Sequence, residues 1–258
     1  MNRFHVAEKS EMSNARNMRN TNNALESLPT KLESREKPFH NAVRIQDSVT
    51  SGPERKALLW LAAHMPASVN SDHLTLLGFV AMFCAGCSYA FARWNPWGLI
   101  LATLCLALNW FGDSLDGTVA RFRNRQRPRY GFYVDHMIDS FGALFLMGGL
   151  GLSGYVDWRI AIGMLVAFLL LSIETYLASY TLGVFRLSFA KFGPTEIRIL
   201  VAIGNTVSFF HPHARVPGSS YGLLDFGGAI AVAAMTVMAI VAAVSHTMTL
   251  YREETLSG

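Results

Sequence analysis

Apolar and polar residues are unevenly distributed along the 258 residues of the chain. The first fifty-odd residues are polar and charged, whereas from Leu74 onward most of the chain consists of apolar runs separated by short polar breaks. Six runs are long enough to cross roughly 30 Å of hydrocarbon, the fifth only marginally. They cover about residues 73–92, 97–121, 132–152, 158–184, 196–211 and 223–250. Because they do not alternate with a period of two, they predict helices rather than barrel strands.

This pattern predicts an all-α membrane protein, a bundle of six transmembrane helices over residues 67–258. Residues 1–52 show no periodicity and are expected to form a polar, disordered arm. Residues 53–66 contain a short amphipathic segment, which is too short to span and is expected to lie as a helix in the membrane interface. The first residues lack the apolar stretch of a signal peptide, so we expect no cleavage there.

Basic residues gather on one side of the predicted bundle. The loop between the second and third runs, residues 121–129, has an Arg at every second position, whereas the opposite loops hold one Arg each. The positive-inside rule therefore places both termini and this loop on the cytoplasmic side of a multi-pass protein. Because the chain is compact, we expect the membrane to be a bacterial inner membrane rather than that of the endoplasmic reticulum. The net charge of +4 is modest and concentrated in that loop, which argues against nucleic acid as a partner.

Two pairs of aspartates lie inside the predicted spans, near the cytoplasmic side. Asp113 and Asp116 are three positions apart, and Asp135 and Asp139 are four apart, so each pair shares one face of a helix. A carboxylate in a membrane segment costs roughly 2.5–3.5 kcal/mol on insertion scales, so four of them indicate a site that faces the bundle interior. Oxygen donors without a suitably spaced His or Cys favour two hard cations, Mg²⁺ or Mn²⁺. Such a pair of ions suits phosphoryl transfer.

The residues around the aspartates fit a nucleotide. Gly117 and Ala120 lie about one turn from the first pair and keep the helix surface shallow. Arg121 follows one turn after Gly117 and can reach a pyrophosphate as a forked donor. Gly131, one turn before Asp135, would allow two helices to approach closely.

Together these residues match a known signature at all of its eight fixed positions. The matching stretches are Asp113-x-x-Asp116-Gly117-x-x-Ala120-Arg121 and Gly131-x-x-x-Asp135-x-x-x-Asp139. They closely resemble the signature of the CDP-alcohol phosphotransferases, with one residue more than usual between Arg121 and Gly131. That residue falls in the Arg-rich loop, where insertions are best tolerated.

The resemblance implies an enzyme of phospholipid biosynthesis that moves a substituted phosphate from a CDP-alcohol to an acceptor hydroxyl and releases CMP. It implies that Asp113, Asp116 and Asp135 are metal ligands, and that Asp139 is both a ligand and the general base. It also implies a homodimer, and a nucleotide site formed by Gly117, Ala120, Arg121, Gly131, Asp72, His73, Leu74 and Thr75.

The residues after the fourth run leave the substrates open. Arg186, Lys191 and Arg198 resemble basic residues that bind the acceptor phosphate in members with phosphorylated acceptors. Gly193-Pro-Thr-Glu196 instead resembles a stretch of choline- and ethanolamine-phosphotransferases, so we favour a donor of the CDP-choline or CDP-ethanolamine type with diacylglycerol as acceptor. Glu196 could equally be a charge that complements a helix N-terminus.

Two alternatives remain. Within the family, the donor could be CDP-diacylglycerol and the acceptor a polar molecule such as inositol phosphate or glycerol phosphate. From another class, a divalent-cation transporter would also place acids in membrane helices. Gly117, Ala120 and Arg121 favour the enzyme, since a cation path has no evident use for them.

Several other polar residues and the cysteines give weaker indications of function. Glu174 in the fourth run either lines the cavity or hydrogen-bonds a neighbouring helix, and His246 and Asp225 have no identifiable partner and are interpreted as structural. Three cysteines give no disulfide framework. Cys84 and Cys87 form a Cys-x-x-Cys within the first run, which we interpret as helix packing.

Overall fold

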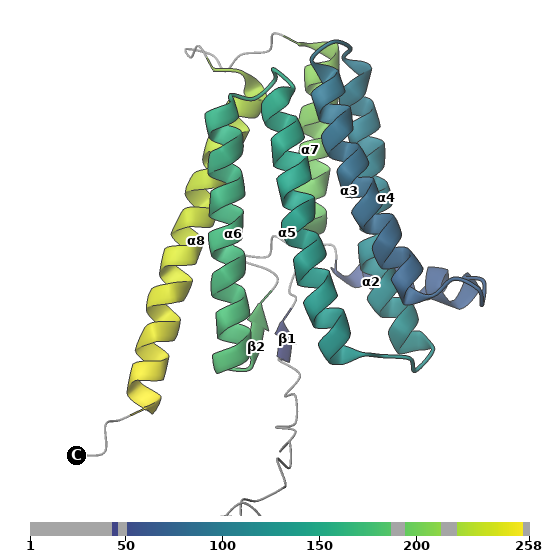
Figure 1. Cartoon of the computed structure of the whole chain (residues 1–258), viewed down its shortest axis with the longest axis vertical. Helices are drawn as coiled ribbons and strands as arrows, with labels where there is room; N and C mark the ends of the chain where they lie inside the picture. The colour runs from purple at the N-terminus through teal and green to yellow at the C-terminus, as the bar shows by residue number, and fades with distance from the viewer. Residues whose placement is uncertain (1–42, 46–50, 187–193, 213–220, 255–258) are drawn as a thin grey trace, which may run out of the picture. The chain divides into compact units, whose positions relative to one another are not determined.

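The computed structural model describes residues 43–45, 51–186, 194–212 and 221–254 (Figure 1). All of them belong to one compact unit, Asn41–Gly258, and they form seven helices and two short strands. Most of the arm expected at residues 1–52 lies outside the described residues, as does Lys191.

A helix occupies each of the six apolar runs. These helices are α3 (Ser71–Ala92), α4 (Trp97–Phe122), α5 (Pro128–Leu152), α6 (Trp158–Thr181), α7 (Pro194–Phe210) and α8 (Leu223–Glu253). α5 begins with Pro128, which suits a first turn because the N–H that proline lacks has no helical partner there. α6 begins after Asp157, whose carboxylate accepts a hydrogen bond from the backbone N–H of Arg159 at 2.8 Å.

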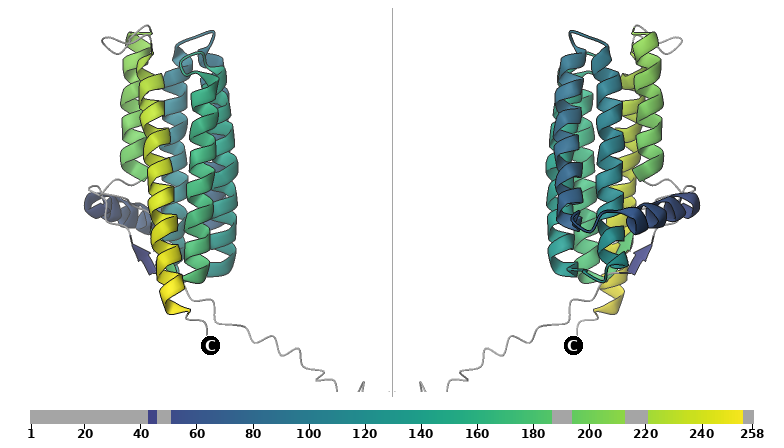
Figure 2. Two further views of the ribbon diagram at one scale, coloured as in Figure 1. Left: turned by 90° about the vertical axis from the view of Figure 1, so that its left-hand side faces the viewer. Right: turned by 90° about the vertical axis from the view of Figure 1, so that its right-hand side faces the viewer.

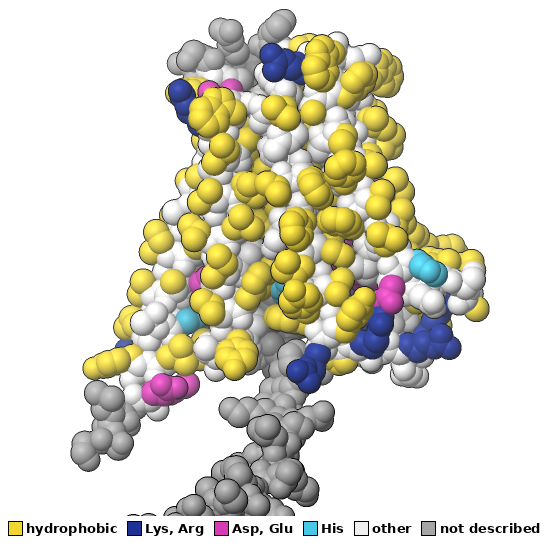
Figure 3. All heavy atoms as spheres, in the orientation of Figure 1, with side chains coloured by type: hydrophobic (Ala, Val, Ile, Leu, Met, Phe, Trp, Pro, Cys, Tyr) yellow, Lys and Arg dark blue, Asp and Glu magenta, His cyan; other side chains and the backbone are white. Residues whose placement is uncertain are grey.

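Four of the helices, α3, α4, α6 and α8, are long and apolar enough to cross a membrane. Among the described helices, α5 and α7 are not: α7 has 17 residues, and α5 carries charged residues in its first half. Figure 3 shows hydrophobic side chains covering the long helices on one face, with Lys and Arg gathered toward the two ends. The six-span count therefore stays a prediction.

Close packing around α3 depends on glycines. α3 packs against α4 and α5, α6 packs against α5 and α8, and α7 packs against α4. At the crossing of α3 and α5, a Cβ on Gly149 would collide with the backbone of Gly86. At the crossing of α3 and α4, a Cβ on Gly112 would lie 2.6 Å from the Leu74 carbonyl oxygen. Small residues thus allow the backbones that carry the acidic segments to approach each other.

α2 (Ser51–His64) occupies the segment expected to form a short amphipathic helix, and it lies crosswise to the long helices (Figure 2). Its buried side packs on α4, where Ala62 is 1% exposed in a cluster with Leu74, Leu115 and Val119. On its outer side Trp60 is exposed, a large apolar surface for a helix of this length. The interfacial location of α2 stays a prediction that this exposed tryptophan supports.

Two short strands interrupt the otherwise helical architecture. β1 (Val43–Ile45) pairs in parallel with β2 (Val184–Arg186), with Val43 opposite Val184. The expectation of an all-α fold did not include this pair, and Val43–Ile45 fall within the arm that was expected to be disordered. β-Branched residues at these positions favour extended backbone, but nothing in the sequence indicates that the two segments meet.

Candidate active site

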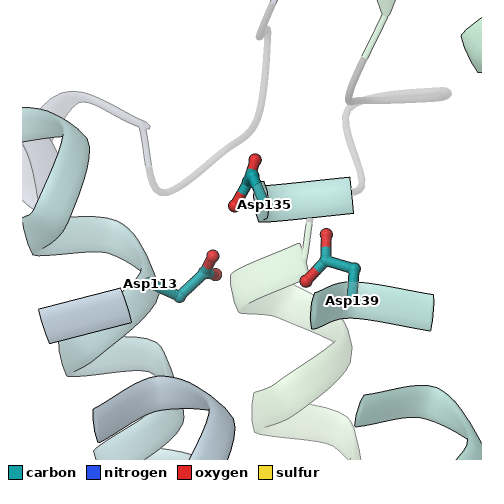
Figure 4. A group of neighbouring side chains, drawn as sticks. All are labelled: Asp113, Asp135 and Asp139. Atoms are coloured by element: carbon teal, nitrogen blue, oxygen red, sulfur yellow. The ribbon is translucent and has the colours of Figure 1, made fainter. Parts of the chain in front are cut away.

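Three aspartates from two helices converge on one point. Asp113 of α4 and Asp135 and Asp139 of α5 each offer a carboxylate oxygen, and these oxygens lie within 4.8 Å of one another. Figure 4 shows the three carboxylates turned toward the space between the helices. Oxygens around one hard cation sit at about 2.0–2.6 Å from it, so they are separated by at most about 4–5 Å. The spacing of these three oxygens therefore fits a shared divalent cation.

Arg198 of α7 adds a positive charge beside this cluster. Its Nη2 lies 2.9 Å from Oδ2 of Asp113 and 2.9 Å from Oδ1 of Asn109. The guanidinium carries one charge against three carboxylates, so the group as a whole remains negative. A negative group of oxygen donors fits Mg²⁺ or Mn²⁺.

Asp116 lies apart from these three carboxylates. Its Oδ2 accepts a hydrogen bond from Thr75 Oγ1 of α3 at 2.6 Å, and its Oδ1 accepts one from the backbone N–H of Gly117. The reason is helical geometry: three residues advance 300°, which turns the Asp116 side chain about 60° from that of Asp113. The structure thus brings three of the four expected ligands together and directs the fourth toward α3.

Arg121 folds back over Gly117. Its Nη1 lies 3.2 Å from the position that a Cβ on Gly117 would take, and its Nη2 donates to Thr118 Oγ1 at 3.2 Å. Ala120, one turn after Asp116, is half-buried. The space that Gly117 leaves is therefore covered by a cationic side chain, which is compatible with a phosphate at that place.

The four expected nucleotide residues at the start of α3 have different surroundings. Thr75 contacts Asp116, as described above, and Asp72 forms an exposed ion pair with Arg127. His73 accepts a hydrogen bond from the backbone N–H of Asn70 at 3.2 Å and so caps the helix. Leu74 is 3% exposed and belongs to the apolar core beneath α2. Of these four side chains, Thr75 is thus the one that reaches the acidic residues.

The expected acceptor residues are also divided. Arg198 reaches the cluster, Arg186 belongs to β2, and Lys191 lies outside the described residues. Glu196 stands in the first turn of α7, a position where a negative charge complements the helix dipole. Its role toward an acceptor stays a prediction.

Gly131 does not lie at a close approach of two described helices. Among the described residues, no atom of another segment lies within 4 Å of a Cβ built on it, since it stands in the first turn of α5, away from the crossing with α3. The close approach occurs at Gly86 and Gly149 instead.

Sequence reasoning missed one residue beside the cluster. Asn109 is buried, accepts from Arg198 and donates from Nδ2 to the Gly78 carbonyl oxygen at 3.1 Å, which ties α4 to α3. It precedes Asp113 by four positions and therefore shares its helix face, a signal that was present in the sequence.

A second polar contact joins α6 and α8. Glu174 Oε1 lies 2.5 Å from His246 Nδ1, so Glu174 bonds a neighbouring helix, one of its two expected roles. The expectation that His246 and Asp225 have no partner is wrong. Asp225 Oδ1 accepts a hydrogen bond from the backbone N–H of Asp157 at 2.7 Å. The hydrogen-bond partners of His246 and Asp225 are more than sixty positions away in the sequence, so the local pattern of residues could not indicate them.

The fold and the site define a helical protein with membrane-type helices and an acidic centre suited to divalent cations. The family model of the CDP-alcohol phosphatidyltransferases matches residues 69–250, so the chain belongs to this family, which confirms the resemblance seen in the sequence. The chain is 34% identical over 113 residues to an archaetidylinositol phosphate synthase from Pyrococcus horikoshii. That match covers 44% of this chain and 53% of the relative, about half of its length.

Proposed function

We propose that the chain is a membrane transferase that moves a substituted phosphate from a CDP-alcohol to the hydroxyl of an acceptor and releases CMP. The observation that carries this proposal is the group of three carboxylates within 4.8 Å, inside the region matched by the family. A cation path would account for the carboxylates alone, whereas Arg198 beside Asp113 and Arg121 over Gly117 provide for anionic substrates.

We infer a lipid-linked CDP donor, such as CDP-diacylglycerol, and a polar phosphorylated acceptor of the inositol phosphate kind. This replaces the initial preference for CDP-choline or CDP-ethanolamine with diacylglycerol. The relative is named for a product that contains inositol phosphate. Arg198 supports the same assignment, because diacylglycerol offers no charge to a guanidinium at the cluster.

In the proposed mechanism the two arginines bind the substrates and Asp139 takes the proton. Arg121 and the surface around Gly117 bind the pyrophosphate of the donor, and Arg198 orients the phosphate of the acceptor. Asp139 accepts the proton of the acceptor hydroxyl on a carboxylate oxygen while that hydroxyl attacks the β-phosphorus and the bond to CMP breaks.

Asp113, Asp116, Asp135 and Asp139 would hold two divalent cations. When bound, these ions would stabilise the negative charge that develops on the phosphates. Asp116, which Thr75 holds toward α3, is the proposed ligand that stands apart from the other three.

The proposal includes a topology. Residues 67–258 form six spans, α2 lies in the interface, residues 1–52 form a polar arm, and the carboxylates face the cytoplasm of a bacterial inner membrane. Two copies are expected to associate. The Arg-rich segment between α4 and α5, close to the carboxylates in the chain, supports this orientation.

The test is a panel of CDP-alcohols crossed with acceptors, using the purified chain with Mg²⁺ or Mn²⁺ and scoring CMP and lipid mass. We expect CMP with a CDP-lipid and a phosphorylated polyol. Asp139→Asn should abolish its release, and Glu253→Gln, an exposed acid at the end of α8, should not. Ion flux into proteoliposomes without any CMP would instead establish the transporter.

A further inference from the structure

The first turn of α2 carries an acid where its buried stripe calls for an apolar residue. Glu54, Leu58 and Leu61 follow one another at steps of four and three positions, which places them on one face of α2, and Met65 comes directly after the helix. The last three pack against the core that joins α2 to α4. A leucine at position 54 would continue this contact, so a carboxylate there needs another explanation.

Glu54 holds two other helices at once. Its Oε1 accepts a hydrogen bond from Trp110 Nε1 of α4 at 2.9 Å and another from Thr195 Oγ1 of α7 at 2.9 Å. Its Oε2 is buried and has no hydrogen-bond partner among the described residues. A buried oxygen without a partner is costly, so packing alone does not favour this side chain.

The two donors stand next to residues of the candidate site. Trp110 follows Asn109 directly in α4, and Thr195 precedes Arg198 by three positions in the first turns of α7. Arg198 itself donates to Asn109 and Asp113. α4 and α7 are thus joined by two adjacent ties, one through Glu54 and one through Arg198.

We propose that Glu54 is a positioning residue for the acceptor side of the site. By holding Thr195 to Trp110 it fixes the first turn of α7, and this in turn sets the Arg198 guanidinium against Asp113. α2 therefore contributes to acceptor binding although it carries no residue of the site itself. This inference rests on the proposed function in assigning the acceptor to Arg198.

The positioning step is tested on the purified full chain without any substrate. In Glu54→Leu and Thr195→Val, backbone amide exchange in the first turns of α7 should be about tenfold faster, the equivalent of one charge-assisted hydrogen bond. Thr195→Ser keeps the donor and should exchange like the wild type, whereas Glu54→Gln keeps an acceptor without the charge and should fall between the wild type and Glu54→Leu. Lys56→Gln, an exposed change one turn into the same helix, is the control. Unchanged exchange in Glu54→Leu would overturn the proposal.

The acceptor step is tested by the kinetics of the same variants. Glu54→Leu should raise the KM for the acceptor about tenfold and leave the KM for the donor within about twofold, because the donor does not depend on Arg198. Equal increases of both KM values would mean that Glu54 only supports folding and would also overturn the proposal. If the wild type releases no CMP from any pair of substrates, the proposed function fails, and amide exchange still decides whether Glu54 positions α7.

Discussion

Two acidic groups lie within the long helices that the structure describes, and they differ in how far their carboxylates are balanced by hydrogen-bond donors. Between α4 and α5, three carboxylates lie within 4.8 Å of one another. Between α6 and α8, one carboxylate, that of Glu174, lies 2.5 Å from one imidazole, that of His246. An acid beside a base satisfies its own hydrogen bonding, whereas three acids together repel unless a cation joins them. The balanced pair thus explains helix packing, and the unbalanced group indicates a ligand.

The surroundings reinforce this difference. The Glu174 side chain is 13% exposed and its contact serves to connect two helices. The Asp113 side chain contacts Arg198 and is 31% exposed, so it stays within reach of a ligand. Both groups look alike in the sequence, as acids inside apolar runs. Their partners distinguish them.

The largest expected difference between the two groups is in metal binding. Asp135→Asn should weaken Mn²⁺ binding about 100-fold, because it removes one of the charged oxygens around the cation. Glu174→Gln, the matched change in the other group, should leave binding unchanged. Electron paramagnetic resonance of free Mn²⁺ measures both. Equal affinity in Asp135→Asn and the wild type would contradict a cation site at the three carboxylates.

A smaller effect is expected at Arg198. Arg198→Gln should raise the KM for a phosphorylated acceptor about tenfold or more, since a charge-assisted contact is lost. The acceptor KM of Arg198→Lys should fall between those of the wild type and Arg198→Gln, because an ammonium keeps the positive charge but offers fewer donors in a less fixed geometry. Steady-state rates of CMP release at varied acceptor concentration measure this. An unchanged acceptor KM with a raised donor KM would instead assign Arg198 to the donor.

The smallest effect on turnover is expected at the balanced pair. His246→Gln should lower the free energy of unfolding by about 1–3 kcal/mol, because Glu174 then loses its partner inside the helices. CMP release should stay within about threefold of the wild type. Thermal unfolding in detergent and the CMP assay measure the two quantities. A large loss of turnover without a loss of stability would give the pair a role in the reaction.

The sequence predicted the helices well because each run is at least 16 residues long and mostly apolar. All six coincide with helices to within a few residues at most ends. The prediction that Asp113, Asp135 and Asp139 lie close together also agrees with the structure. It followed from their spacing and from the short connection between their helices.

Other features could not be predicted because they depend on contacts between distant segments. Asp116 is held by Thr75, 41 positions earlier, and Glu54 by Thr195, 141 positions later. A helical pattern gives the face on which a residue lies, but not which helix covers that face. The pairing of β1 with β2 could not be predicted from the sequence for the same reason.

The contact of Gly86 with Gly149 acts on the carboxylates from a distance. Asp139 lies about 15 Å along α5 from Gly149, at 1.5 Å per residue. A methyl group at this crossing that tilted α5 by about 5° would swing Asp139 by roughly 1.3 Å over that length. Coordination distances tolerate only about 0.2 Å. The absence of side chains at Gly86 and Gly149 therefore helps to fix the position of the Asp139 carboxylate, although the crossing lies about three turns of α5 away from it.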